Sequence, residues 1–211
     1  TQETISNINS TTTVMLPAMT GSFELRRDGD DVVLRDSNQT DLFRANASDA
    51  KRLEIIGSDG DDTLIVDASI AEPNVLRGLK IDGGSGTTTL QLRGTAESVS
   101  FSNFTTGVRG EVTIDRQLVE WANFSTLQDA VIAKARDFAF SAAADVVEVT
   151  DGAAVADGIS QLRLNGTSFD FTNPTESLRI DARGGADRVT LTSVDAGMTA
   201  AIVVAGGGGD D

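Results

Sequence analysis

The feature that most constrains this chain is an internal duplication. Within the 211 residues, residues 53–67 align with residues 178–192 at an offset of 125, and residues 79–86 align with residues 202–209 at an offset of 123. Because separate segments keep nearly one offset, the chain carries two copies of one unit. Units repeated in this way are expected to stack and to bury faces against each other.

The duplication predicts three parts. Residues 1–20, rich in Thr, Ser and Asn, are expected to form a flexible leader or linker, with a short strand near residues 14–16. Residues 21–137 are predicted to form a first β-solenoid repeat unit, and residues 138–211 a second, truncated unit.

Short runs of alternating apolar and polar residues predict an all-β fold. Each run is bounded by Gly, Asp, Asn or Ser, as expected for strands separated by tight turns. The runs are residues 23–27, 31–36, 41–45, 53–57, 63–67, 79–82, 88–92, 98–103 and 111–115. One stretch differs, because residues 126–132 have a helical pattern and are expected to form a turn or two of helix.

The pattern that carries chemistry is G-G-x-G-x-D-x-apolar-x, a repeat associated with β-helices and calcium. Its windows, some imperfect, are residues 57–65, 83–91, 182–190 and 206–211. Ser58 replaces a glycine in the first window, and Thr88 stands at the aspartate position of the second. Glycine permits the torsions of a tight turn, so that backbone carbonyls point at one place and the aspartate adds a carboxylate. The apolar residue that follows points into the core.

Such turns suit calcium, which takes about 6–8 oxygen ligands. We predict Ca²⁺ at the turns 57–62 and 206–211, where stacked coils would share carbonyls and carboxylates. The candidate ligand residues are Gly57, Asp59, Gly60, Asp61, Asp62, Asp187, Gly206, Gly207, Gly209 and Asp211. The hydroxyl of Thr88 is a poor ligand, so a ladder of hydroxyl groups is expected at its turn instead. The alternative for all these aspartates is a solvated turn, since Asp-Gly is favourable turn chemistry.

The motif resembles the calcium-binding nonapeptide repeats of the repeats-in-toxin (RTX) type. Its starts lie 26 residues apart (Gly57 to Gly83) and 24 residues apart (Ala182 to Gly206), instead of in tandem. The layout, including residues 110–129, also resembles the long repeat units of giant bacterial exoproteins and adhesins. These resemblances imply a parallel β-solenoid, similar to a right-handed β-helix, with coils of about 25 residues. They also imply calcium loading and a secreted or cell-surface location.

Composition narrows the function further. The net charge is −15, from 32 acidic and 17 basic residues, which disfavours nucleic acid and anionic lipid as partners. No apolar run approaches about 18 residues, so no membrane insertion is expected. Cysteine and histidine are absent. We therefore expect no disulfide framework, no zinc or copper site and no enzyme.

The expected function is mechanical. The chain should be a calcium-stabilised structural module of a large secreted or cell-surface protein, a rigid spacer or adhesion stalk whose partners are other repeats of the same parent protein. The first alternative is a subunit of an extracellular filament, in which copies of the chain pair through strand edges. A more distant alternative is a β-helix that binds or cleaves carbohydrate. Trp121, the one tryptophan, is expected in the core and not as a sugar platform.

Overall fold

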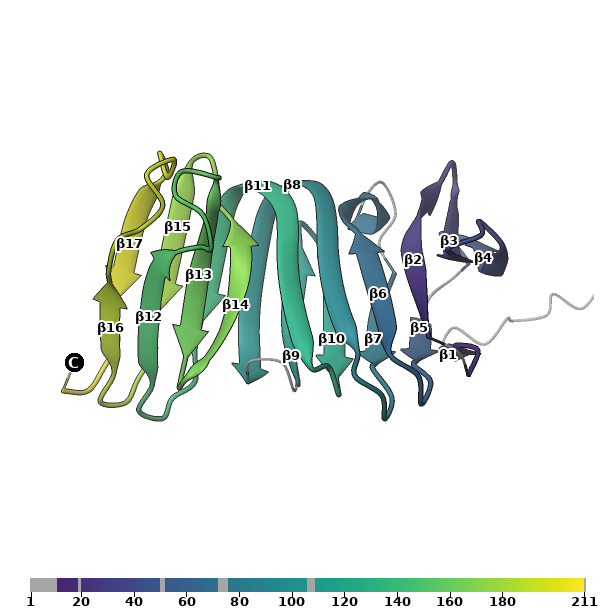
Figure 1. The fold of residues 1–211 in the computed structure, drawn as a ribbon, viewed down its shortest axis with the longest axis horizontal. Coiled ribbons are helices and arrows are strands. Elements are labelled where there is room, and N and C mark those ends of the chain that lie inside the picture. Colours follow the sequence, from purple (N-terminus) through teal and green to yellow (C-terminus); the bar gives the residue numbers. More distant parts are fainter. Residues whose placement is uncertain (1–10, 19, 50–51, 72–75, 106–108, 211) are drawn as a thin grey trace, which may run out of the picture.

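The computed structural model describes residues 11–18, 20–49, 52–71, 76–105 and 109–210, and in these the chain is all-β (Figure 1). The strands are β1 (Thr11–Met15), β2 (Gly21–Asp28), β3 (Asp31–Asp36), β4 (Asp41–Asn46), β5 (Arg52–Ile56), β6 (Asp62–Asp67), β7 (Gly78–Asp82), β8 (Thr89–Thr105), β9 (Arg109–Ile114), β10 (Gln117–Ala122), β11 (Thr126–Ala139), β12 (Val146–Asp151), β13 (Ile159–Leu164), β14 (Thr167–Thr172), β15 (Ser177–Asp181), β16 (Arg188–Leu191) and β17 (Ala201–Ala205). A 3-10 turn, η1 (Ala68–Ala71), follows β6. The described residues form no helix long and apolar enough to cross a membrane.

All nine predicted runs coincide with strands, three of them extending one residue beyond an end, and two, residues 88–92 and 98–103, lie along the long strand β8. The short strand expected near residues 14–16 is β1, which begins slightly earlier. The boundary predicted between the two units, at residues 137 and 138, lies inside β11.

The helix expected at residues 126–132 is wrong, because these residues belong to β11. Leu127, Asp129 and Val131 are buried while their neighbours are exposed, which is the period of a strand. β11 also pairs in parallel with β8, in one register from Thr126 to Ala139. Extended pairing with a neighbouring strand therefore overrides the local helical preference.

The strands form one large, mostly parallel sheet, and long β8 and β11 belong to two runs of strands within it. One run is β1–β5–β7–β10–β9–β8–β11–β15–β17. The other is β4–β3–β2–β6–β8–β11–β14–β13–β12–β16. Among the strands of the described ranges, antiparallel pairs occur only at β2–β3–β4, β8–β9–β10 and β12–β13–β14. Within the described residues the sheet does not close on itself.

The strand pairings of the first part recur in the last part. β5 pairs in parallel with β1 and β7, and β15 pairs in the same way with β11 and β17. β2 pairs with β6 as β12 pairs with β16. The three-strand meander β2–β3–β4 has its counterpart in β12–β13–β14. The sequence segments that align at an offset near 125 therefore occupy equivalent places in the sheet.

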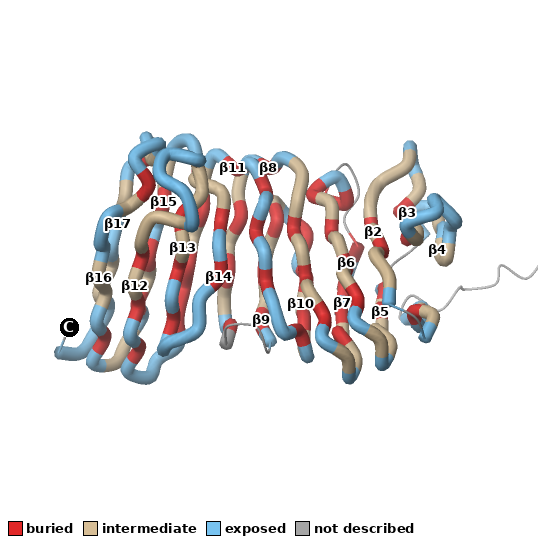
Figure 2. The backbone as a smooth tube through the Cα atoms, in the orientation of Figure 1, coloured by how far each residue is buried: buried red, intermediate tan, exposed pale blue. Residues whose placement is uncertain are grey.

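Inward-facing apolar residues of both runs form one continuous core (Figure 2). At its centre aromatic rings pack closely, with the Phe101 and Phe138 ring centroids 5.3 Å apart and those of Phe138 and Phe171 5.2 Å apart. Trp121 is buried beside Phe101, as expected from the sequence. Full burial of each such ring stabilises the fold by about 1.5–3 kcal/mol.

A buried ion pair interrupts this apolar core. Arg136 and Asp129, both in β11, have fully buried side chains, and the Arg136 Nε lies 2.8 Å from the Asp129 Oδ2. Arg136 also donates hydrogen bonds to the backbone carbonyls of Val131 (2.9 Å) and Thr172. Burial raises the pKa of the Asp129 carboxyl, and the Arg136 charge opposes that rise. The pair and its carbonyl partners join β11 to the end of β14.

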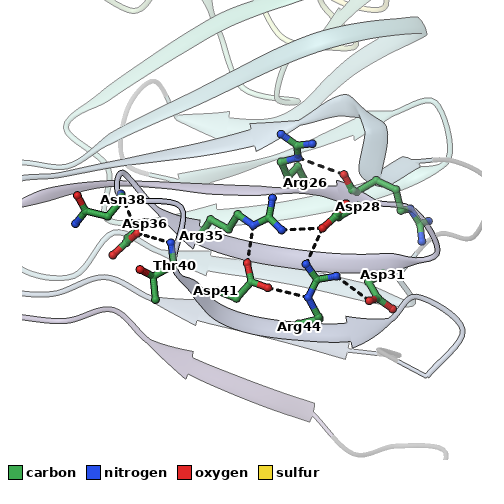
Figure 3. A network of polar contacts seen from close by, with 10 residues as sticks. Arg26, Asp28, Asp31, Arg35, Asp36, Asn38, Thr40, Asp41 and Arg44 are labelled. Carbon is green, nitrogen blue, oxygen red and sulfur yellow. Dashed lines mark hydrogen bonds and ion pairs between the residues drawn. The ribbon is translucent and has the colours of Figure 1, made fainter.

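A second polar network covers the meander β2–β3–β4 (Figure 3). Arg44 forms ion pairs with Asp28 (2.6 Å), Asp31 (2.8 Å) and Asp41 (2.7 Å). Arg35 reaches two of the same carboxylates, Asp28 at 2.7 Å and Asp41 at 2.5 Å. Alternating charges thus hold three antiparallel strands together on their solvent face.

This network should be visible in a pH titration. Hydrogen bonds from Arg44 and Arg35 lower the pKa of Asp28, and those from Arg35 and Arg44 lower the pKa of Asp41. Each pKa is lower in the folded than in the unfolded chain, where it is about 3.9. The stabilisation is therefore present above the unfolded value and is lost as pH falls through the folded value.

We expect Arg44→Met to return both pKa values towards the ordinary range in an NMR titration of the side-chain carboxyl carbons. Lys134→Met, which removes an exposed ion pair with Glu97 elsewhere, is the matched control and should leave them unchanged. Unaltered Asp28 and Asp41 titrations in Arg44→Met would contradict the ion-pair geometry of the network.

Candidate metal centre

The predicted glycine turns lie directly on one another at one edge of the sheet, the lower edge in Figure 1. The Gly57 N–H donates to the Asp82 carbonyl (2.7 Å), and the Gly83 N–H donates to the Ala122 carbonyl (2.8 Å). Three successive turns, at residues 57–62, 83–88 and 122–126, are thereby hydrogen-bonded in a stack.

Glycine is required in this stack because backbone meets backbone. A Cβ on Gly86 would lie 1.9 Å from the Gly60 carbonyl oxygen. At Gly84, where φ is +80°, a Cβ would lie 2.2 Å from the Ser58 carbonyl oxygen. Close backbone contact between neighbouring turns therefore explains the glycine spacing of the motif.

A second stack follows at the same edge. The Phe140 N–H donates to the Asp181 carbonyl (2.9 Å), and the Ala182 N–H donates to the Ala205 carbonyl (2.9 Å). Gly185 N–H donates to the Gly208 carbonyl (3.0 Å). The turns at residues 140–145, 182–187 and 205–210 are thus stacked like those of the first part.

The most buried carboxylate of the predicted set, that of Asp62, holds its own turn together. Its Oδ2 accepts hydrogen bonds from the Ser58 N–H (3.2 Å) and hydroxyl (2.8 Å), and the Ser58 Oγ accepts one from the Gly60 N–H (3.0 Å). The same Ser–Asp arrangement recurs between Ser141 and Asp145. The Asp62 Oδ1 is buried and accepts no hydrogen bond from the described residues.

The other predicted aspartates have different surroundings. Asp59 and Asp61 are exposed, and the Asp61 Oδ1 accepts a hydrogen bond from the Thr87 N–H of the next turn (2.9 Å). The buried Asp187 accepts one from the Asp145 N–H (2.8 Å). Its position joins two turns of the second stack.

The last predicted turn carries its glycines against the preceding turn. Gly206 begins the turn, and Gly207 and Gly209 have φ values of +87° and +147°. The carbonyls of Arg183 and Gly185 face these two glycines. Asp211, the remaining predicted ligand, lies outside the described residues.

The turn with threonine in place of aspartate is closed by a hydroxyl that donates to a carbonyl of the same turn, which is not the expected ladder of hydroxyls. The Thr88 side chain is buried, and its hydroxyl donates to the Gly83 carbonyl (2.7 Å). Thr88 donates where Asp62 accepts, so the two turns close with opposite hydrogen-bond polarity.

Within the described ranges, no cluster of three acidic side chains forms at the turns. One such cluster forms at the opposite edge of the sheet. Asp151, Asp157 and Asp195 each offer a carboxylate oxygen within 4.8 Å of the others. No sequence motif marks them, because Asp195 is distant along the chain from Asp151, at the end of β12, and from Asp157, in the loop after it. The parallel pairing of β12 with β16 brings these loops together.

Comparisons with protein-family models, with curated proteins and with solved structures give no match for this chain.

Proposed function

We propose that this chain is a structural module, a parallel β-solenoid with coils of about 25 residues, in a large secreted or cell-surface protein. The observation that supports this role is the recurrence of parallel pairing along the chain, from β1–β5–β7 to β11–β15–β17. Strands that pair along one axis resist bending, because each coil is hydrogen-bonded to the next. A rigid spacer or adhesion stalk uses that property.

The proposal assigns no catalysis to the chain. Its sequence contains no histidine or cysteine to serve as a general base or nucleophile. The single tryptophan is buried and packs on Phe101, so it offers no open platform for a sugar ring. The buried tryptophan favours a structural role over carbohydrate binding, and glycoside cleavage, which uses paired carboxylates, does not depend on histidine or cysteine.

Calcium at the glycine turns is part of the proposal. The buried, unpartnered Oδ1 of Asp62 lies in a turn that contacts the carbonyl-rich turn 83–88. With a net charge of −15, the chain would gain from any bound cation. Because metal binding adds to folding free energy, such a module would be more stable in calcium-rich external medium than in the cytosol.

A calcium-dependent melt tests this role. We expect calcium at 100 times its dissociation constant to stabilise the chain by about 2.7 kcal/mol per site, measured by circular dichroism with calcium or excess chelator. Asp62→Asn should reduce the gain. Asp145→Asn is the matched control, because it disturbs the equivalent Ser–Asp turn of the second stack, where both carboxylate oxygens have partners. Identical melts in calcium and chelator would contradict calcium stabilisation.

The filament alternative has one specific observation in its favour. In the strands β16 and β17, Leu191 is 42% exposed and Val204 44% exposed. Their sequence counterparts, Val66 and Ile81, are 0% and 2% exposed, because β8 and β10 cover them. The edge formed by β16 and β17 is therefore apolar and suits the addition of further strands, from another repeat or from a second copy. Fibres that grow with concentration in sedimentation and electron microscopy would favour this alternative, and a monodisperse monomer would favour the spacer.

A further inference from the structure

We propose that Asp151, Asp157 and Asp195 form a calcium site that ties the loop after β12 to the loop after β16. β12 and β16 begin at the stacked turns 140–145 and 182–187, so their far ends and this site lie at the opposite edge of the sheet. The inference goes beyond the proposed structural role, and it does not depend on whether the glycine turns bind calcium.

The fold brings the three carboxylates together through strand pairing. β12 and β16 are parallel and in register up to Val149 and Leu191, so the loops that follow them leave the sheet side by side. One oxygen of each carboxylate lies within 4.8 Å of the others. In the described part of the chain, no lysine or arginine forms an ion pair with any of them. Three close negative charges without a cation repel one another.

Asp195 carries the strongest indication of a ligand. It is 2% exposed, and its Oδ1 accepts hydrogen bonds from the Gly197 N–H (2.7 Å) and the Asn173 side-chain amide (2.9 Å). The Asn173 Oδ1 in turn accepts a hydrogen bond from the hydroxyl of buried Ser160 (2.7 Å). The carboxylate is therefore held in one orientation, while its Oδ2 is buried without a hydrogen-bond partner.

The surroundings of Asp195 are specific in shape as well as polarity. A Cβ on Gly197 would lie 2.8 Å from the Asp195 Oδ1, so glycine allows the backbone N–H to approach the carboxylate. Orienting groups of this kind, placed behind a ligand, are typical of metal sites.

Asp151 and Asp157 supply the other two carboxylates of the cluster. The Asp151 Oδ1 is also buried and accepts no hydrogen bond from the described residues. The Asp157 Oδ1 accepts a hydrogen bond from the Ile159 N–H (2.9 Å), and its side chain is exposed. Two buried carboxylate oxygens thus have no hydrogen-bond partner, which is costly unless a positive charge is bound. The exposed carboxylate of Asp157 makes the cluster accessible to an ion from solvent.

Calcium fits this donor set better than other ions. Carboxylate oxygens are hard ligands, which favour calcium and magnesium. Calcium takes about 6–8 oxygen ligands at about 2.3–2.6 Å in a flexible geometry, so three carboxylates whose oxygens lie within 4.8 Å of one another can share it. Magnesium requires near-ideal octahedral geometry at about 2.0–2.1 Å and is usually held by only one or two carboxylates.

The test is an NMR titration of the full chain with calcium chloride and, separately, magnesium chloride. The reporters are the backbone amides of Gly197 and Ile159, which donate to Asp195 and Asp157. We expect both to shift and saturate with calcium, and to need at least tenfold more magnesium. Asp157→Asn, a change at an exposed side chain that should leave the fold intact, should weaken calcium binding at least tenfold.

Matched variants separate this site from the glycine turns. Asp170→Asn removes an equally exposed carboxylate of β14 outside the cluster and should leave the titration unchanged, as should Asp62→Asn at the turn. No shift of Gly197 at millimolar calcium, or a shift that Asp157→Asn does not weaken, would overturn the site. Loss of the Gly197 titration in Asp62→Asn would also overturn it, because the shift would then originate at the turns.

Discussion

Replacing Arg136 by methionine should destabilise the fold by about 3–5 kcal/mol, because it leaves the fully buried Asp129 carboxylate without its charge partner. The loss includes the hydrogen bonds that Arg136 donates to the carbonyls of Val131 and Thr172. Denaturant unfolding, followed by the fluorescence of the buried Trp121, measures the change directly. Replacing both partners, with Asp129→Leu added to Arg136→Met, should recover most of the loss.

The pH dependence of the Arg136→Met variant identifies the cause. Burial already raises the pKa of Asp129, and without Arg136 the pKa rises further above its unfolded value. A carboxyl whose pKa is higher in the folded chain penalises folding above that pKa, and the penalty disappears below the unfolded value. The destabilisation should therefore shrink as pH falls. A loss that is equally large at acid pH would indicate missing packing and not an unpaired charge.

Gly84→Ala should cost about 2–4 kcal/mol, the second largest effect expected. The added methyl group would meet the Ser58 carbonyl at 2.2 Å, and the positive φ of +80° is unfavourable for alanine. The turns must separate to relieve the contact, which weakens the hydrogen bond from the Ser85 N–H to the Ser58 carbonyl (3.2 Å). Denaturant unfolding gives the free energy, and hydrogen exchange at Ser85 reports the separation.

Gly166→Ala is the control for this change. Its φ is +94°, also left-handed, but no atom lies within 4 Å of the added Cβ. It should therefore cost only the conformational penalty of about 1 kcal/mol. Equal losses at the two glycines would show that contact between stacked turns contributes nothing to stability.

The strand positions could be predicted from sequence because their alternation and their turn residues agree. The run at residues 31–36 is β3 with the same limits, and the two aligned halves of the sequence hold equivalent strands. β11 could not be predicted, because its alanine-rich, charged sequence suits a helix in isolation. Its parallel pairing with β8 decides its conformation.

The candidate sites, like the strands, could be predicted from sequence only in part. Glycine spacing predicted the turns at residues 57–62 and 83–88, since close backbone contact there requires glycine at fixed positions. The turn at residues 140–145 has no glycine and was missed, although Ser141 and Asp145 close it just as Ser58 and Asp62 close theirs. The acidic cluster was missed as well, because strand pairing, and not spacing along the chain, brings its members together.

β11 has a consequence for how the molecule bears load. It spans the predicted limit between the two sequence copies, and it pairs with β8 on one side and with β14 and β15 on the other. The two copies are consequently joined through shared hydrogen bonds and not through a flexible connector. Force applied along the long axis would not find a weakly bonded boundary between the two copies. Cleavage of the chain at that boundary would divide a strand instead of releasing two domains.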